Sequence, residues 1–292
     1  MPLFFLFTIL GVKEHRETEK PKKVEGGVFK KMIDAVKHND QLRWITVIFL
    51  IQQLGNGFVL GGIGSTYIYL QYGYEGGLYS LFSTVGVAAT AFLMLFYPAI
   101  SKRINRKPLM NMMVVISAVG YALMILSRFI PSIGFLLLTV GYMISNFGLY
   151  SYYLIMMISI INTVEYNEYK TGDRNEAIIA SVRPLITKMS SAFIVVMTTA
   201  TYMIFGVTNY TNQISEFESA SAAGLITDAE KLEGISQVIQ GVDPAQTWGL
   251  LILMVVVPYS MMILSNALYQ KHYKLDEAEY ERICKELEAR RK

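Results

Sequence analysis

Residues 164–191 read VEYNEYKTGDRNEAIIASVRPLITKMSS, a charged turn that leads directly into an apolar segment. Gly172 predicts the end of one helix, and Asp173 with Glu176 three positions later predicts a capping box at the start of the next. The second helix then carries Lys188 inside its apolar part. A cation in the hydrocarbon of a membrane costs about 2.5–3.5 kcal/mol on insertion scales, so it is rarely retained without a use. Lys188 is therefore the first candidate functional residue.

The helix around Lys188 has a polar face without a counter-ion. Five residues share a stripe with Lys188 within roughly 80° of arc, and small and hydroxylated ones are among them: Ser181, Leu185, Ala192, Val195 and Thr199. Because the other apolar segments contain no Asp or Glu, a partner carboxylate must come from another polypeptide, a ligand or a part of the protein outside this chain. The alternative is that Lys188 snorkels to the headgroups, roughly 16 Å from the predicted helix start at Ala177.

The composition is that of a membrane protein. Of 292 residues, 53% are hydrophobic and 17% charged, and the mean hydropathy is +0.37. Six apolar segments are long enough to span a bilayer: 43–70, 78–100, 108–126, 133–161, 177–206 and 248–269. Each must be helical, because lipid offers the backbone no hydrogen-bond partners. The predicted fold class is an all-α, polytopic membrane protein.

The basic residues predict the orientation of these helices. All Lys and Arg except Arg128, Lys188 and Lys231 lie in four segments: 13–43, 101–107, 163–183 and 271–292. Cytoplasmic loops are enriched in basic residues, so both ends of the six-helix block are expected in the cytoplasm. The net charge of +3 then reflects topology, and no nucleic-acid partner is expected.

The sequence offers no catalytic or metal-binding constellation. The single cysteine, Cys284, excludes an internal disulfide, and His15, His38 and His272 lack the spacing of metal ligands. No nucleophile elbow, phosphate-binding loop or dinucleotide fingerprint is present. We therefore expect neither an enzyme nor a bound cofactor.

Polar aromatic residues mark a candidate substrate side on the segment 133–161. Tyr142, Asn146, Tyr150 and Tyr153 lie within about 80° of arc on a helix. Aromatic rings with nearby hydroxyl and amide groups are the usual lining of a small-molecule pocket. The alternative is an interfacial aromatic belt, which suits Tyr142 near the outer end better than the deeper Tyr153.

The first complete span offers a second polar side. Gln52 and Asn56 share it, while Gly57, Gly61 and Ser65 place small residues at four-residue spacing. The polar side suits a water-filled cavity and contact with substrate, and the small side suits close helix packing. Packing alone is an equally open explanation for both.

The charged turn predicts an inner gate. Six charged residues are crowded into it: Glu165, Glu168, Lys170, Arg174, Glu176 and Arg183. Ion pairs in such a cluster can break and re-form as two halves of a protein move. The alternative is a merely solvated loop.

The chain is expected to divide into four parts: 1–12, the end of a truncated transmembrane helix; 13–42, a cytoplasmic connector; 43–270, the six-helix domain; and 271–292, a cytoplasmic C-terminal helix. Within the connector, apolar residues at helical spacing beside lysines predict a short amphipathic helix on the membrane surface or a solvated linker helix. In the long external loop, Thr227 and Glu230 predict a capped helix that continues to about Gln240.

Three motifs resemble one known family. VEYNEYKTGDRNEA (164–177) followed by Lys188 resembles the C-terminal motif of glycoside-pentoside-hexuronide:cation symporters, the melibiose permease group of the major facilitator superfamily. FTILGVKEH (7–15) resembles the end of that family's sixth helix, and YKLDEAEYERICKELEARR (273–291) its usual tail. The basic loop 101–107 resembles the loop between the second and third helices of each half of that superfamily.

The resemblance implies a fold of twelve helices in two halves, with sugar and coupling cation bound between them. This chain would be helices seven to twelve with the end of helix six, in a bacterial inner membrane. Lys188 would match a helix-eleven lysine involved in coupling, and Tyr153 a helix-ten tryptophan that lines the sugar pocket. The carboxylates that bind the cation, Na+ or H+, would belong to the missing N-terminal half. Asn162, where an aspartate is common, and Ala177, where a glycine often stands, depart from the family pattern.

The function expected from this reading is the C-terminal half of a cation-coupled glycoside or sugar symporter that works by alternating access. Its partners would be the sugar, the bilayer and an N-terminal six-helix half, either covalent or separately encoded. Two alternatives stay open: a subunit of a split transporter, and a membrane sensor or scaffold that transports nothing. The DNA directly upstream of Met1 would separate a fragment from a six-helix protein.

Overall fold

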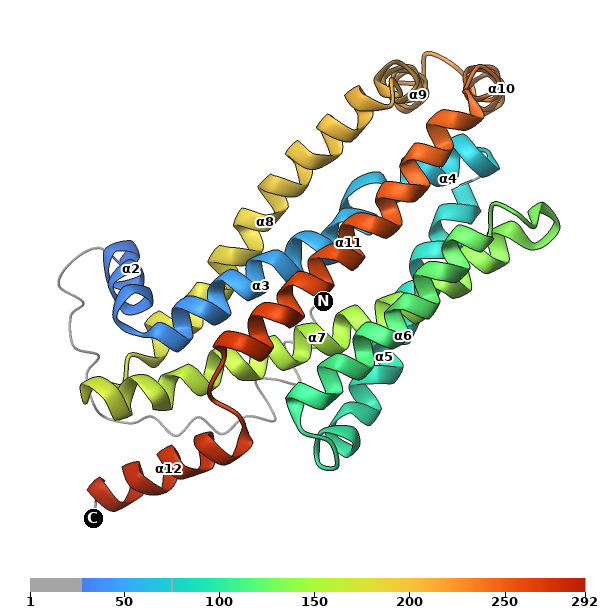
Figure 1. Cartoon of the computed structure of the whole chain (residues 1–292). Coiled ribbons are helices and arrows are strands. Elements are labelled where there is room, and N and C mark those ends of the chain that lie inside the picture. Colours follow the sequence, from blue (N-terminus) through green and yellow to red (C-terminus); the bar gives the residue numbers. More distant parts are fainter. Residues whose placement is uncertain (1–27, 75, 292) are drawn as a thin grey trace, which may run out of the picture.

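The computed structural model describes residues 28–74 and 76–291, and long α-helices dominate that part of the chain (Figure 1). The described residues contain no strand. The elements of the apolar spans are α3 (Asp40–Phe58), η1 (Val59–Ile63), α4 (Gly64–Tyr72), α5 (Gly76–Ser101), α6 (Arg106–Leu126), α7 (Gly134–Thr171), α8 (Glu176–Ile204) and α11 (Pro244–His272). The predicted all-α, polytopic fold class is confirmed.

Five helical segments are long and apolar enough to cross a membrane: Asp40–Tyr72, Arg106–Leu126, Pro131–Thr171, Glu176–Ile204 and Pro244–His272. The remaining predicted span, 78–100, coincides with α5, whose stretch Gly77–Ala88 is also an apolar helix. Each apolar segment that the sequence predicted as a span is therefore helical.

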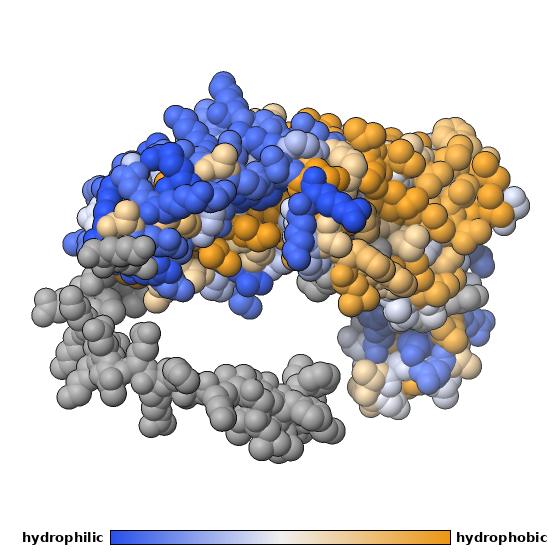
Figure 2. All heavy atoms as spheres, turned by 90° about the horizontal axis from the view of Figure 1, so that it is seen from below, coloured by the Kyte–Doolittle hydropathy of each residue, from blue (hydrophilic) through white to orange (hydrophobic). Residues whose placement is uncertain are grey.

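The basic segments gather at one end of the molecule. The turn between α5 and α6, the turn between α7 and α8, the helix α2 (Val28–His38) and the terminal helix α12 (Glu277–Arg291) lie there together (Figure 1). Seen from below, hydrophilic residues cover this region, and hydrophobic residues cover the side that holds α5 and α6 (Figure 2). At the opposite end lie η2 (Pro131–Ile133), α9 (Thr208–Ala222) and α10 (Asp228–Gln240).

Glycines allow α6 and α7 to pack backbone against backbone. A Cβ atom on Gly120 would lie 2.4 Å from the backbone N of Ser145, and one on Gly141 would lie 2.6 Å from the carbonyl O of Gly120. A Cβ atom on Gly148 would overlap the hydroxyl of Ser117. Small residues at such crossings are typical of membrane helices, where close packing takes over from the hydrophobic effect.

The first span is a broken helix rather than the single helix expected from the sequence. Gly62 has φ −126° and ψ −109°, outside the helical region, within the π-helical segment η1. The N–H of Gly64 bonds to the carbonyl of Val59 and not, as in an α-helix, to that of Leu60. The hydroxyl of Tyr79 on α5 donates to the carbonyl of Leu60 at 3.1 Å. A side chain of a neighbouring helix therefore bonds to the backbone at the break, where irregular helix geometry in a membrane is tolerated.

The turn between α7 and α8 differs in part from its prediction. Gly172 ends α7 in the left-handed region with φ 80°, as predicted. The predicted capping box is wrong, because α8 begins at Glu176 and the preceding Asn175 makes no side-chain cap. The carbonyl of Asp173 instead accepts a hydrogen bond from Asn167 Nδ2 at 2.8 Å.

Two helices predicted outside the spans, one in the external loop and one in the connector, are present in the structure. The capping box of Thr227 and Glu230 is present at the start of α10, which ends at Gln240 as predicted. The predicted short amphipathic helix is α2, with Met32 buried in the core and Lys37 exposed. The predicted helix end at 1–12 and the connector as far as residue 27 lie outside the described residues.

Candidate functional site

Lys188 lies near the middle of α8 and points away from the bundle. It is exposed, while Val182, Ile186 and Ser190 face inward on the same helix. Within the described ranges Lys188 makes no hydrogen bond and no ion pair. At twelve residues from Glu176 it lies about 18 Å along the helix from that start. The lysine thus occupies a central level on a face that residues 28–74 and 76–291 leave uncovered.

The whole of α8 is less covered than its neighbours. Only 28% of its apolar window is buried, against 39 to 50% for the other four candidate spans. Ala192, Val195 and Thr199, which share the stripe of Lys188, are exposed with it. This face would have to meet lipid, solvent or another group of helices.

Three of the predicted substrate residues lie together. Tyr150 and Tyr153 are half-buried on α7, with ring centroids 6.4 Å apart in an edge-on arrangement. The side chain of Asn56, from α3, interacts with the hydroxyl of Tyr150. The ring of Phe49 lies 6.0 Å from that of Tyr153. The result is a partly open group of hydroxyl, amide and aromatic surfaces.

The other two predicted substrate residues are buried between helices. Asn146 is 1% exposed, and its amide donates to the carbonyl of Gly86 on α5 at 2.9 Å. Gln52, also 1% exposed, donates to the carbonyl of Leu149 on α7 at 3.2 Å. The Oε1 atom of Gln52 has no partner among the residues described. In this arrangement both side chains hold helices together.

The charged turn forms a cluster around Arg174. Its guanidinium contacts Glu165 and Glu168 at 3.1 Å each and Glu176 at 3.2 Å. Burial disfavours the charge, but hydrogen bonds to Glu176 and Glu168 outweigh it and raise the pKa of Arg174. Four of the six predicted gate residues therefore lie in one network.

The remaining two gate residues have other partners. Lys170 pairs with Asp40, at the start of α3, at 2.7 Å, and the hydroxyl of Tyr166 donates to the same carboxylate at 2.9 Å. Arg183 reaches the hydroxyl of Tyr153 instead. The sequence did not single out Asp40, because a lone aspartate before an apolar segment is an ordinary helix start.

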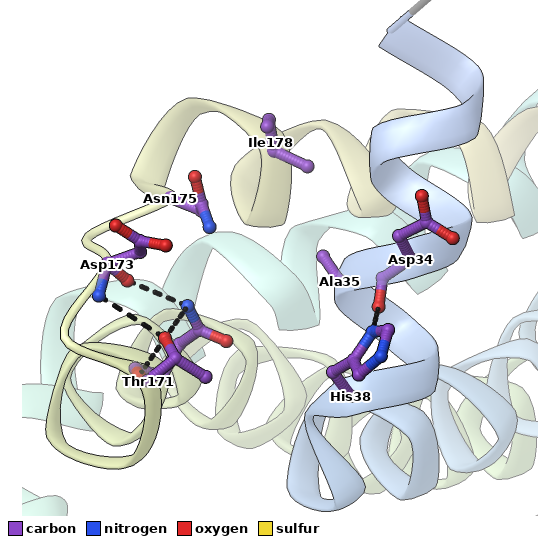
Figure 3. Close-up of a pocket in the computed structure, with 8 residues that line it drawn as sticks. Asp34, Ala35, His38, Thr171, Asp173, Asn175 and Ile178 are labelled. Carbon is purple, nitrogen blue, oxygen red and sulfur yellow. Dashed lines mark hydrogen bonds between the residues drawn. The ribbon is translucent and has the colours of Figure 1, made fainter. Parts of the chain in front are cut away.

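A polar cavity of about 300 Å³ lies beside this cluster, between α2, α7 and α8 (Figure 3). It is lined by Asp34, Ala35, His38, Asn167, Thr171, Asp173, Asn175 and Ile178. Several of these groups bond to one another: His38 Nδ1 donates to the carbonyl of Asp34 at 2.8 Å, and Asn167 Nδ2 donates to Thr171 Oγ1 at 3.3 Å. The cavity lies at the end of the molecule that holds the basic segments, apart from Tyr150 and Tyr153.

Arg106 is a buried cation that the sequence reasoning missed. It begins α6, is 7% exposed, and pairs with Glu277 at the start of α12. Oriented by its hydrogen-bond partners, the amide of Asn162 presents its oxygen to Arg106 Nη1 at 2.8 Å. Asn162 therefore lies against Arg106 and not in the cluster of Arg174. No group of three or more His, Cys, Asp or Glu side chains that could hold a metal ion occurs in the described part.

Comparison with known proteins identifies the family of the chain. Residues 1–277 match the family described as MFS/sugar transport protein. A lactose permease of Leuconostoc lactis is 27% identical over 194 residues, which are 64% of this chain and 28% of that protein. A lactose permease of Lactobacillus helveticus is 23% identical over 98% of this chain and 39% of its own length.

A third relative, a raffinose carrier protein of Pediococcus pentosaceus, is 24% identical over 96% of this chain and 38% of its own length. The chain thus spans about two fifths, or less, of the length of these relatives. Their names are those of permeases and a carrier, not of enzymes. The family match extends through every span, so the resemblance to the sugar symporters is confirmed: this multi-pass membrane protein belongs to the MFS/sugar transport protein family.

Proposed function

We propose that this chain is the C-terminal half of a transporter that symports a glycoside or other sugar with Na+ or H+. The family match and the lactose and raffinose transporters among its relatives support the substrate class. The share of those relatives that the chain covers supports its role as one part of a larger transport unit. The N-terminal six helices would be covalently attached or separately encoded.

The observation that carries this proposal is the uncovered face of α8. A lysine at the middle of a spanning helix, with no partner in the described chain, needs either a counter-ion or water. A second half that presents a carboxylate to Lys188 would satisfy it and would also cover the apolar residues around it. We assign Lys188 to the organisation of charge between the two halves.

The mechanism would be alternating access, in which the two halves rock about a central site. Tyr150, Tyr153 and Asn56 would contact the sugar, and Asn146 and Gln52 would support them from within the bundle. Sugar and cation are both substrates, and the cation would be bound mainly by the N-terminal half. Coupling requires that each substrate bind more tightly when the other is present.

The network of Arg174 would act as part of the inner gate. Its carboxylates come from α7 and from the start of α8, so a relative movement of these two helices would separate them. The basic segments support a cytoplasmic location for this end of the molecule. In a bacterium the surrounding membrane would be the inner membrane.

Transport by the purified, reconstituted protein tests the proposal. Proteoliposomes would be given radiolabelled lactose or raffinose under an imposed Na+ gradient, an imposed pH gradient or no gradient. We expect uptake that depends on one of the two gradients and that requires the N-terminal half. A coding segment for six helices directly upstream would identify that half. Binding of a partner protein without any sugar uptake would favour a sensor or scaffold instead.

A further inference from the structure

The contact between Arg183 and Tyr153 joins two residues that were predicted to have different roles, one in the gate and one at the sugar. Arg183 Nη2 donates to the hydroxyl oxygen of Tyr153 at 2.6 Å, and the guanidinium carbon lies 5.7 Å from the centre of the tyrosine ring. Arg183 comes from α8 and Tyr153 from α7. The contact therefore links a candidate gate residue to a candidate substrate residue across two helices.

Arg183 has no carboxylate partner in the described parts of the chain. The acids near it in sequence, Glu165, Glu168 and Glu176, are all held by Arg174. Arg183 is exposed, and its guanidinium has five N–H donors of which the hydroxyl of Tyr153 takes one. Its position is thus set by a phenol and not by an ion pair of the gate.

This contact decides which way the hydroxyl proton of Tyr153 points. A phenol has one proton to donate, together with lone pairs that accept. Because Arg183 donates to the oxygen, the proton of Tyr153 must point elsewhere and is free for another acceptor. A cationic donor also makes the bond stronger than one between neutral groups. The ring is further held by contacts with Phe49 and Tyr150.

We propose that Arg183 is a positioning residue of the sugar site, which fixes the hydroxyl of Tyr153 so that its proton is offered to an oxygen of the bound sugar. The inference rests on the proposed transport function and deepens it. It moves Arg183 out of the inner gate. It also identifies the ligand group that Tyr153 recognises as a hydrogen-bond acceptor, a hydroxyl or ring oxygen of a glycoside.

Two substitutions and their combination test this role in the reconstituted transporter with both halves present. Tyr153→Phe removes the hydroxyl and keeps the ring; Arg183→Met removes all donors and keeps the length of the side chain. Each should raise the half-saturation concentration for lactose or raffinose about tenfold, the usual effect of one hydrogen bond to a charged or ordered partner. The maximal rate should change much less.

The double variant gives the decisive measurement. If Arg183 acts through the hydroxyl of Tyr153, the half-saturation concentration of the double variant should also rise only about tenfold, because Arg183 has nothing to position once that hydroxyl is gone. Independent effects would multiply to about a hundredfold and would overturn the inference. Arg183→Lys should recover part of the loss. Arg43→Met removes another exposed arginine, which is assigned neither to the sugar site nor to the inner gate, and serves as the matched control.

A gate role would give another pattern. Arg183→Met would then change the maximal rate at an unchanged half-saturation concentration, with or without the hydroxyl of Tyr153. This result would overturn the positioning role and leave the proposed transport function standing. If the wild-type transporter neither bound nor transported a sugar, the proposed function would be overturned, and the positioning role with it. Thermal unfolding of each variant, expected within a few degrees of the wild type, would show that a loss is not caused by misfolding.

Discussion

Glu277 accepts two hydrogen bonds from Arg106, one from the backbone N–H at 2.8 Å and one from Nε at 2.9 Å. Arg106 Nη2 also donates to the carbonyl of Leu275 at 3.1 Å. The side chain of Arg106 is 9% exposed and that of Glu277 40%. These bonds fasten the terminal helix α12 to the start of α6, on the same end of the molecule as the network of Arg174.

We expect Glu277→Gln to loosen α12. The amide keeps the shape of the carboxylate but loses its charge, so the buried guanidinium of Arg106 loses its only anionic partner in the described structure. A hydrogen bond to a charged group is worth about 1.5–3 kcal/mol, and partial exposure of Glu277 reduces this to about 1–2 kcal/mol. Detached α12 should become about 5 to 30 times more populated.

The single cysteine of the chain reports this change without any engineering. Cys284 is half-buried on α12, so detachment of the helix exposes the thiol fully and should raise its rate of labelling by a maleimide. Labelling should accelerate in Glu277→Gln. Glu281→Gln, which breaks an exposed pair with Lys285 on the same helix, is the matched control and should leave the rate near that of the wild type. Equal acceleration in both variants would contradict a special role for Arg106.

The same contact should make the attachment of α12 sensitive to acid. Burial raises the pKa of Glu277, but the backbone and side-chain hydrogen bonds from Arg106 outweigh it, and the net pKa is lower than the ordinary value of 4.5. A lowered pKa stabilises the attached state above that ordinary value, and this stability is lost as pH falls through the lowered pKa. Hydrogen exchange of α12, corrected for intrinsic rates, should therefore increase below about pH 4.5.

Glu277→Gln supplies the comparison for the pH series. With no carboxyl at this position, the exchange of α12 should already be fast at neutral pH and should change less on acidification. Other carboxylates of α12, such as Glu279 beside Arg282, also titrate with a lowered pKa. If the variant kept the full acid response of the wild type, those surface pairs and not Glu277 would be responsible.

The sequence predicted the helices well and their contacts poorly. Runs of apolar residues are sufficient for the spans, because any such segment in a membrane must be helical. The stripe of Tyr142, Asn146, Tyr150 and Tyr153 shows the limit. Its outer part is covered: Tyr142, expected at the membrane interface, is 2% exposed and stacks on Phe82 of α5. A helical wheel gives the face of a residue but not the neighbouring helix that covers it.

For charged residues, too, the sequence does not show which of them are buried or what they pair with. Lys102, Arg103, Arg106 and Lys107 form one basic run, and only Arg106 is buried. Its partner lies 171 positions away, so no local pattern marks it. The predicted cluster of the α7–α8 turn was recovered in large part because Glu165, Glu168 and Arg174 are close in sequence. Arg183, about two helix turns into α8, instead reaches across to α7.

Gly120→Ala should destabilise the packing of α6 on α7. The added Cβ would lie 2.4 Å from the backbone N of Ser145 and 2.5 Å from the carbonyl of Gly141, and neither atom can rotate away. The helices must then separate, at a cost of about 1–3 kcal/mol for overpacking. Thermal unfolding in detergent should show a clearly lower midpoint. Gly61→Ala, where a Cβ meets nothing within 4 Å, is the matched control, and an equal loss there would contradict the packing argument.

Arg174→Gln should leave three carboxylates close together without their common cation. Glu165 and Glu168 have side chains only 16% and 15% exposed, so their repulsion is less screened than that of surface charges. We expect the free energy of unfolding to fall by about 1 kcal/mol in low salt and by less in 1 M salt. Unfolding midpoints at the two salt concentrations measure this difference. A loss independent of salt would mean that packing of the arginine, and not its charge, is what matters.

Lys188→Leu tests the charge on the uncovered face of α8. Leucine is well tolerated in a membrane helix and removes the cost of a cation at hydrocarbon depth, so the protein should fold at least as well as the wild type. If Lys188 pairs with a carboxylate of the second half, that acid is left without its partner, and sugar transport driven by the cation gradient should fall at least tenfold. Lys188→Arg keeps the charge and should retain more activity. Unchanged gradient-driven uptake in Lys188→Leu would show that the lysine only reaches toward the headgroups, and Ala192→Leu, on the same face, controls for added bulk.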